Sequence, residues 1–118
     1  MTVIFKIAHA EEWRAAERAG HYAGSEKDRA DGFIHFSTAA QLAETLRRYY
    51  ANASNLVLIA VDESVIGDRL KWEHAPSRGE KFPHLYAPLP LSAVKWTAAI
   101  ARDSLGTAIV PPMAFAPD

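Results

Sequence analysis

The sequence predicts one α+β domain in which two helices pack on a mixed, mostly antiparallel β-sheet. The first observation is length, because 118 residues suit one hydrophobic core and leave no room for two. The second is the order of patterns, which runs strand, helix, strand, helix and then several strands with short connections. The third is that no repeat or linker divides the chain. We therefore expect residues 1–118 to form a single domain with an irregular tail from about residue 103.

The beginning of the chain carries a strand pattern and then a helix pattern. Residues 2–8 are β-branched and aromatic, with Lys6 as the one charged interruption, which indicates a mostly buried strand. Residues 10–19 place Trp13 and several alanines at helical spacing before a glycine, which predicts a short amphipathic helix. Residues 21–31 are polar and rich in turn formers, so we expect a surface loop there.

Residues 32–37 predict a short strand that runs straight into a helix. On this strand His35 and Ser37 share one face. Thr38 begins a capping box, and the apolar stripe after it predicts a helix to about residue 51. A junction of this kind exposes unpaired backbone N–H groups and a partial positive charge, which suit a carboxylate or phosphate oxygen.

The second half of the chain is read as strands with short connections. Residues 56–62 are apolar almost throughout, which predicts a central strand, and one helical turn follows it. Residues 69–74 alternate, so Trp72 and Glu73 should point to opposite sides of a sheet. The remaining predictions are a loop over 75–83, an extended segment over 84–86, a turn or edge segment over 87–91 and a last core strand over 94–101.

Composition excludes several classes of function. The chain has 13 Lys and Arg against 14 Asp and Glu, so it has no excess positive charge with which to bind a nucleic-acid backbone. It has no cysteine, which excludes disulfides, thiolate metal ligands and thiol catalysis. No signal-peptide pattern opens the sequence, and no window approaches the ~18 apolar residues of a membrane span. We expect a cytoplasmic domain that binds neither nucleic acid nor membrane.

The strongest short catalytic signatures are absent, so candidate residues are chosen by their surroundings. His35 lies in an apolar strand beside a helix start. As a functional residue it would sit at the rim of a pocket, where it could orient a ligand hydroxyl or carry a proton. As a structural residue it would be a core histidine bonded to Ser37 or to a carbonyl group.

Glu73 follows Trp72 near the end of a predicted strand. Beside a large aromatic, its carboxylate could be held ready to stabilise a developing cation. The alternative is an exposed carboxylate that pairs with Arg69 or Arg78.

The segment that follows combines a cation, two aromatic rings and an imidazole around a proline. His84 and Tyr86 lie two residues apart on an extended stretch and so face the same way. With Phe82 they could offer a small planar ligand a stacking surface and two hydrogen-bonding groups, or the rings could simply plug one end of the sheet. The histidines and Glu73 permit a metal site on paper, but Glu73 and His74 point apart on one strand, and we predict no metal site.

Across nearly its whole length the chain resembles the bacterial family catalogued as domain of unknown function 952. The most specific matches are Gly-Phe-Ile-His-x-Ser over residues 32–37 and Phe-Pro-His-Leu-Tyr over residues 82–86. The stretches Ile-Phe-Lys-Ile at 4–7 and Leu-Lys-Trp-Glu at 70–73 also match. The family in turn looks like a small, divergent relative of the ADP-ribosyltransferase superfamily, whose split sheets hold NAD in a cleft. The resemblance therefore implies a split β-sheet here.

This resemblance implies roles for the candidate residues. His35 would orient the nicotinamide ribose, Phe82 or Tyr86 would stack on a ring, and Glu73 would stabilise an oxocarbenium-like centre as the glycosidic bond breaks. NAD would then be a substrate, and no resident cofactor is expected. The chain departs from the superfamily in being short for a full NAD cleft.

The leading hypothesis is therefore a pocket for a small anionic or nucleotide-like molecule, and the reaction that the resemblance implies is transfer or hydrolysis of an ADP-ribosyl group. Its catalytic residues would be His35, Glu73 and His84. Its ligand-binding residues would be Lys6 and Arg78 for phosphates, Ser37 and Thr38 as hydroxyl donors, and Phe82 and Tyr86 for rings. A non-catalytic sensing or partner-binding module is the second hypothesis. A structural domain with no pocket joining His35 to Glu73 is the third.

Overall fold

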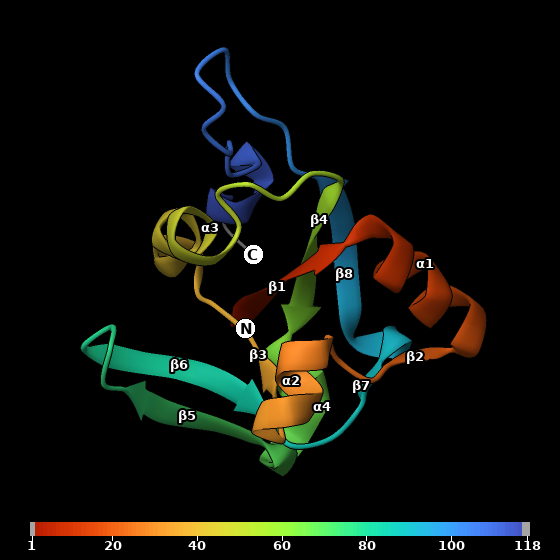
Figure 1. The fold of residues 1–118 in the computed structure, drawn as a ribbon. Coiled ribbons are helices and arrows are strands. Elements are labelled where there is room, and N and C mark those ends of the chain that lie inside the picture. The colour runs from red at the N-terminus through yellow and green to blue at the C-terminus, as the bar shows by residue number, and fades with distance from the viewer. Residues whose placement is uncertain (1, 117–118) are drawn as a thin grey trace.

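The computed structural model describes residues 2–116, in which six strands form two three-stranded sheets. In the first sheet, β4 (Leu56–Asp62) lies between β1 (Val3–His9) and β8 (Val94–Ala99). In the second, β6 (Glu80–Leu85) lies between β3 (Ile34–His35) and β5 (Leu70–Ala75). The short strands β2 (His21–Tyr22) and β7 (Leu89–Pro90) form a separate pair. Figure 1 shows the hairpin of β5 and β6 extending to one side of the first sheet.

The structure confirms an α+β fold and corrects two of its details. Every strand pairing among residues 2–116 is antiparallel, whereas a mixed sheet was predicted. The same residues form four α-helices, whereas two were predicted. The four are α1 (Ala10–Ala19), α2 (Glu26–Asp31), α3 (Leu42–Tyr49) and α4 (Glu63–Ile66). The predicted domain also includes residues 1 and 117–118, which lie outside the described part of the chain.

The alternation of the first sheet explains where the core lies. Along β4, Leu58 and Ala60 face α3, while Ile59 and Val61 face the side covered by α1. All four are buried, which confirms that β4 is the central strand. The helix predicted over residues 10–19 is also confirmed.

The predicted loop over residues 21–31 is wrong, because it contains β2 and α2. Ser25 begins α2 with a capping box, in which its side chain accepts from the Asp28 N–H and Asp28 accepts from the Ser25 N–H. A helix of six residues has little stability of its own and depends on tertiary contacts. Here that contact is the burial of Asp28, whose side chain is 2% exposed.

The predicted loop over residues 75–83 is wrong in its second half. Residues 76–79 form a tight turn, and β6 begins at Glu80 and continues through Pro83. Proline is rare in an inner strand because it has no N–H to donate. Pro83 pairs with Trp72 of β5, but on the other side β3 ends at His35, which is opposite His84. On the β3 side the backbone of Pro83 therefore uses only its carbonyl, which accepts from the Phe36 N–H at 3.0 Å.

The two sheets meet at one bridged pair within residues 2–116. Phe5 and Ser37 exchange two backbone hydrogen bonds, each 2.8 Å long. The bridge is antiparallel and places the end of the β3 segment against β1. Beyond it the sheets diverge, which agrees with the predicted split.

Two further findings concern the rest of the chain. The tail from residue 103 is irregular apart from a 3-10 turn over Pro112–Phe115, and it packs back so that Ala114 is buried against the α3 side of the core. In the part of the chain that the structure describes, no helix has both the length and the apolar character needed to cross a bilayer.

Candidate functional site

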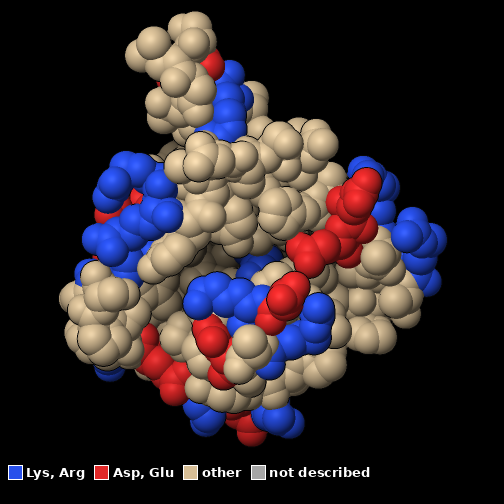
Figure 2. Space-filling view, in the orientation of Figure 1, with Lys and Arg blue, Asp and Glu red and all other residues tan. Residues whose placement is uncertain are grey.

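A cavity of about 350 Å³ lies where the two sheets diverge. Its walls come from β1, α2, the β3 segment, α3 and the hairpin of β5 and β6. Figure 2 shows this face of the molecule hollowed near its centre, with basic side chains beside the hollow. Six of the nine predicted site residues line the cavity, namely Lys6, His35, Ser37, Arg78, Phe82 and His84.

The other three predicted residues, Thr38, Glu73 and Tyr86, are not part of the cavity wall. Thr38 caps the turn before α3: its N–H donates to Gln41 Oε1 at 2.9 Å and its side chain completes the predicted capping box. Glu73 and Tyr86 lie behind His84 and contact each other. Most of the predicted residues therefore lie in the wall, and the other three belong to the shell of residues around it.

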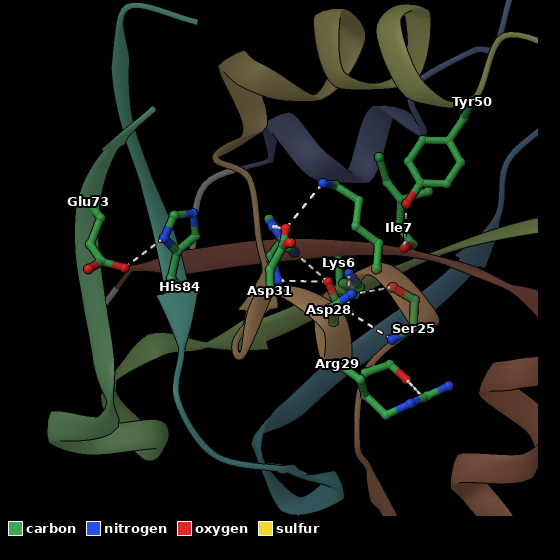
Figure 3. A network of polar contacts seen from close by, with 12 residues as sticks. Lys6, Ile7, Ser25, Asp28, Arg29, Asp31, Tyr50, Glu73 and His84 are labelled. Carbon is green, nitrogen blue, oxygen red and sulfur yellow. Dashed lines mark hydrogen bonds and ion pairs between the residues drawn. The ribbon is translucent and has the colours of Figure 1, made fainter. Parts of the chain in front are cut away.

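Asp28 is the buried anion of the site, and sequence reasoning missed it. Its Oδ2 lies 2.7 Å from Lys6 Nζ, and the two side chains are 2% and 4% exposed (Figure 3). Although burial opposes ionisation, the hydrogen bond from His35 and the charge of Lys6 hold the pKa of the Asp28 carboxyl well below its usual range. Burial in turn lowers the pKa of Lys6 despite the attraction of Asp28. The signal that could have revealed Asp28 is the Ser-x-x-Asp capping box of residues 25–28.

His35 is held by carboxylates at both ring nitrogens. Nδ1 lies 2.5 Å from Asp28 Oδ1, and Nε2 lies 3.0 Å from Asp31 Oδ2. The backbone N–H of His35 also donates to Asp28 Oδ1 at 3.2 Å. Neither contact is the bond to Ser37 or to a carbonyl that the structural interpretation expected. Because both nitrogens face acceptors, the ring is fixed as a donor and offers no free lone pair while both contacts last.

His84 and Glu73 form a second polar group on the small sheet. Glu73 Oε1 accepts from His84 Nδ1 at 2.8 Å and from the Tyr86 hydroxyl at 2.7 Å. These two hydrogen bonds lower the pKa of the Glu73 carboxyl, and the carboxylate raises the pKa of Tyr86. Glu73 therefore pairs with neither Arg69 nor Arg78, contrary to the structural alternative.

An aromatic stack joins the two imidazoles. The centroid of the Phe33 ring lies 4.0 Å from that of the His84 ring, with an angle of 28° between the ring planes, and 4.5 Å from the centroid of the His35 ring. The two imidazole centroids are 5.5 Å apart. His35 and Glu73 thus lie on the same side of the small sheet and are connected through His84, but only the imidazoles reach the cavity. Phe33 was not among the predicted site residues.

Arg78 is the cation that the turn between β5 and β6 contributes to the wall. Its Nη1 donates to Thr45 Oγ1 at 3.1 Å, and its guanidinium carbon lies 4.5 Å from the centre of the Phe82 ring. Nη2 is buried and has no hydrogen-bond partner among residues 2–116. Ser37 Oγ lies 3.3 Å from Thr45 Oγ1, so two hydroxyl groups adjoin the guanidinium. Thr45, which comes from α3, had no signal in the sequence beyond its place in a helix.

These observations define a class of protein: an α+β domain whose split antiparallel sheet encloses a cavity with two imidazoles and a guanidinium on its walls. The chain belongs to the DUF952 family of proteins of unknown function, whose family model matches residues 7–97. This confirms the family resemblance noted from the sequence, whereas the likeness to ADP-ribosyltransferases stays a prediction.

Solved structures of one bacterial protein are similar over most of the chain. The crystal structure of protein CC0527 from Caulobacter crescentus is 42% identical, with a TM-score of 0.86 over 92% of this chain and 94% of that chain. A double mutant of CC0527 gives the same values. The solution NMR structure of CC0527 is 44% identical, with a TM-score of 0.79 over 90% of each chain. No curated protein matches the chain.

Proposed function

We propose that the cavity binds a small anionic, nucleotide-like ligand. The observation that carries this proposal is the convergence of the His35 and His84 rings, the Phe33 stack and the Arg78 guanidinium on one cavity. Aromatic and imidazole rings suit a planar base, and a guanidinium suits a phosphate or carboxylate. The volume of about 350 Å³ is at the small end of ligand sites, so the cavity would enclose one half of a dinucleotide.

Charge supports the anionic character of the ligand. Lys6 is already neutralised by Asp28, so it stabilises the wall more than it attracts a ligand. Arg78 has a neutral hydroxyl and an aromatic ring as its partners, and its Nη2 lacks any partner within residues 2–116. A buried donor without an acceptor is costly, and a ligand oxyanion would relieve that cost after a small shift of the guanidinium.

The finer proposal is that the domain transfers or hydrolyses an ADP-ribosyl group of NAD. His35, as a fixed donor, would orient a ribose oxygen, and His84 would face the reacting end of the ligand. Glu73 would act through His84, because its carboxylate is not part of the cavity wall. This role differs from the direct contact with an oxocarbenium-like centre that the family resemblance implied.

A non-catalytic sensing module is the second candidate, and the same position of Glu73 favours it. With no carboxylate of Glu73 on the wall, the cavity lacks the group that the resemblance assigned to charge stabilisation. Such a module would bind the same class of ligand and release it unchanged.

Two measurements test these proposals. A thermal-shift screen with NAD, ADP-ribose and mononucleotides should stabilise the fold, because a ligand at a hundred times its Kd contributes about 2.7 kcal/mol. The variant His84→Gln should weaken the shift, and His21→Gln, which changes an exposed histidine of β2, should not. Nicotinamide release from NAD would support the enzyme, and saturable binding without product would support the sensor. If no nucleotide-like ligand stabilises the chain, the proposed function is wrong.

A further inference from the structure

We propose that Glu73 and His84 form a proton-accepting dyad, in which His84 Nε2 removes the proton of an acceptor hydroxyl and Glu73 positions the ring. The inference rests on the proposed ADP-ribosyl chemistry and names the residue that would activate water or an alcohol in it. It assigns the proton-accepting role to His84 and leaves His35 as a donor.

The position of the His84 ring is fixed by its neighbours. The residue is 8% exposed and lines the cavity from β6. Phe33 stacks on one side of the ring, and the His35 ring meets it nearly edge to face, at an interplanar angle of 70°. Packing of this kind restricts the ring, so its two nitrogens keep their directions.

The partners of Glu73 decide which nitrogen of His84 carries the proton. Glu73 Oε1 accepts from the Tyr86 hydroxyl and lies 2.8 Å from His84 Nδ1. An ionised carboxylate is an acceptor only, so Nδ1 must be the donor of that contact. In a neutral ring Nε2 is then left with the lone pair.

The free nitrogen of His84 is the one that a ligand can reach. Within residues 2–116 the hydrogen bond of the His84 ring is made by Nδ1, and Figure 3 shows the second ring nitrogen, Nε2, on the side away from Glu73. Both nitrogens of His35, in contrast, lie within 3.0 Å of a carboxylate oxygen. Of these two imidazoles, only His84 presents a lone pair to the cavity.

The step balances with the groups already named. The oxygen of water or of an alcohol forms a bond to the anomeric carbon of the bound ribosyl group. The glycosidic C–N bond breaks, and its electron pair leaves with the nicotinamide. The proton of the attacking oxygen passes to His84 Nε2, and the charge of the resulting imidazolium is balanced by Glu73. Release of that proton to solvent restores the dyad.

The first arm of the test reads the dyad without any substrate. Long-range ¹H–¹⁵N NMR of the full chain should show neutral His84 protonated at Nδ1, and Glu73→Gln should reduce that preference. The matched control is Glu63→Gln, because Glu63 accepts from Trp72 Nε1 at 2.9 Å and makes no contact with His84. Protonation of neutral His84 at Nε2, or an equal effect of both variants, would overturn the dyad.

The second arm measures nicotinamide release from NAD. His84→Gln should lower kcat, measured at saturating NAD, about 10²- to 10⁴-fold, which is the usual contribution of a general base. This loss comes in addition to the weaker binding expected for the same variant. Glu73→Gln should lower kcat and move the acidic limb of the pH profile, which a merely structural residue would not do. If NAD is cleaved and both variants keep full kcat, the dyad is wrong while the proposed function stands. If NAD is neither bound nor cleaved, the proposed function fails, and the NMR result alone decides whether the ring is poised as described.

Discussion

Replacing Asp28 with asparagine should destabilise the fold strongly, because the change leaves Lys6 as an uncompensated buried charge. Oδ2 of Asp28 accepts from Lys6 Nζ at 2.7 Å and from the Ser25 N–H at 2.9 Å. Oδ1 accepts from His35 twice, through the backbone at 3.2 Å and the ring at 2.5 Å. In asparagine one of these two oxygens is replaced by an NH₂ group, which is itself a donor. At either position this NH₂ would face two hydrogen-bond donors and could accept from neither.

The size of the effect follows from these contacts. Loss of two charge-assisted hydrogen bonds at about 1.5–3 kcal/mol each gives about 3–6 kcal/mol. Removal of one partner from a buried ion pair typically costs about 3–5 kcal/mol, which agrees. A domain of 118 residues has a free energy of unfolding of about 6–18 kcal/mol, so the variant should still show an unfolding transition.

Urea unfolding followed by circular dichroism measures the difference. The control is Lys27→Met, which removes an ion pair with Asp31 in which the lysine side chain is 67% exposed, and which should change stability by less than about 1 kcal/mol. The double variant Lys6→Met/Asp28→Asn should recover part of the loss, because no unpaired charge is then left inside. A loss below about 1 kcal/mol for Asp28→Asn, or no recovery in the double variant, would refute the reasoning.

Three further predictions follow from the same contacts. Gly24→Ala should lower the urea midpoint more than Gly20→Ala. Both glycines have a positive φ, +102° and +88°, but only at Gly24 would the new Cβ lie 2.8 Å from Asp28 Cβ. Equal midpoints for the two variants would contradict this contact argument. Removing the phosphate from nicotinamide mononucleotide should weaken its binding to the native chain about 10- to 100-fold, as measured by calorimetric titration. The same change to the ligand should leave its binding to the Arg78→Met variant unchanged, and an equal loss in both proteins would rule out Arg78 as the phosphate ligand. Acid should destabilise the fold, because the pKa of Asp28 is lower in the folded state than in the unfolded state. The contribution of Asp28 to the free energy of unfolding is therefore complete above about pH 4 and declines below it. Urea midpoints measured between about pH 6 and pH 3 should show this decline, and Asp28→Asn should flatten the profile.

The elements that the sequence predicted well are those whose pattern reflects their own burial. β4 is apolar on both faces and proved central, and α1 combined helical spacing with a terminal glycine. The helix start at Thr38 was recognisable because a capping box needs only residues close in sequence. Local signals of this kind can be read from a single chain.

The errors arose where distant contacts decide the structure. α2 is too short and too polar to show an amphipathic pattern, and its burial comes from an ion pair between Asp28 and Lys6 of β1. Pro83 was assigned to the end of a loop, yet it belongs to β6, because β3 stops where the missing N–H would have been needed. Phe33 and Thr45 were missed because the sequence does not show which ring stacks on His84 or which hydroxyl meets Arg78. The sequence thus named six residues of the wall, whereas the partners of those residues depend on the tertiary fold.

The bridge between Phe5 and Ser37, which is the one pair that joins the two sheets within residues 2–116, makes the cavity a property of the strand topology. The two sheets part directly beside that bridge, so the space between them is lined by side chains and is not closed by further backbone pairing. Substitutions of side chains on the walls can therefore change which ligand the cavity binds without breaking a strand pairing. A longer run of backbone pairing between β1 and the segment that follows β3 would instead close this space. Because the contact between the sheets stops at this one pair within residues 2–116, an interior space remains available in so small a domain.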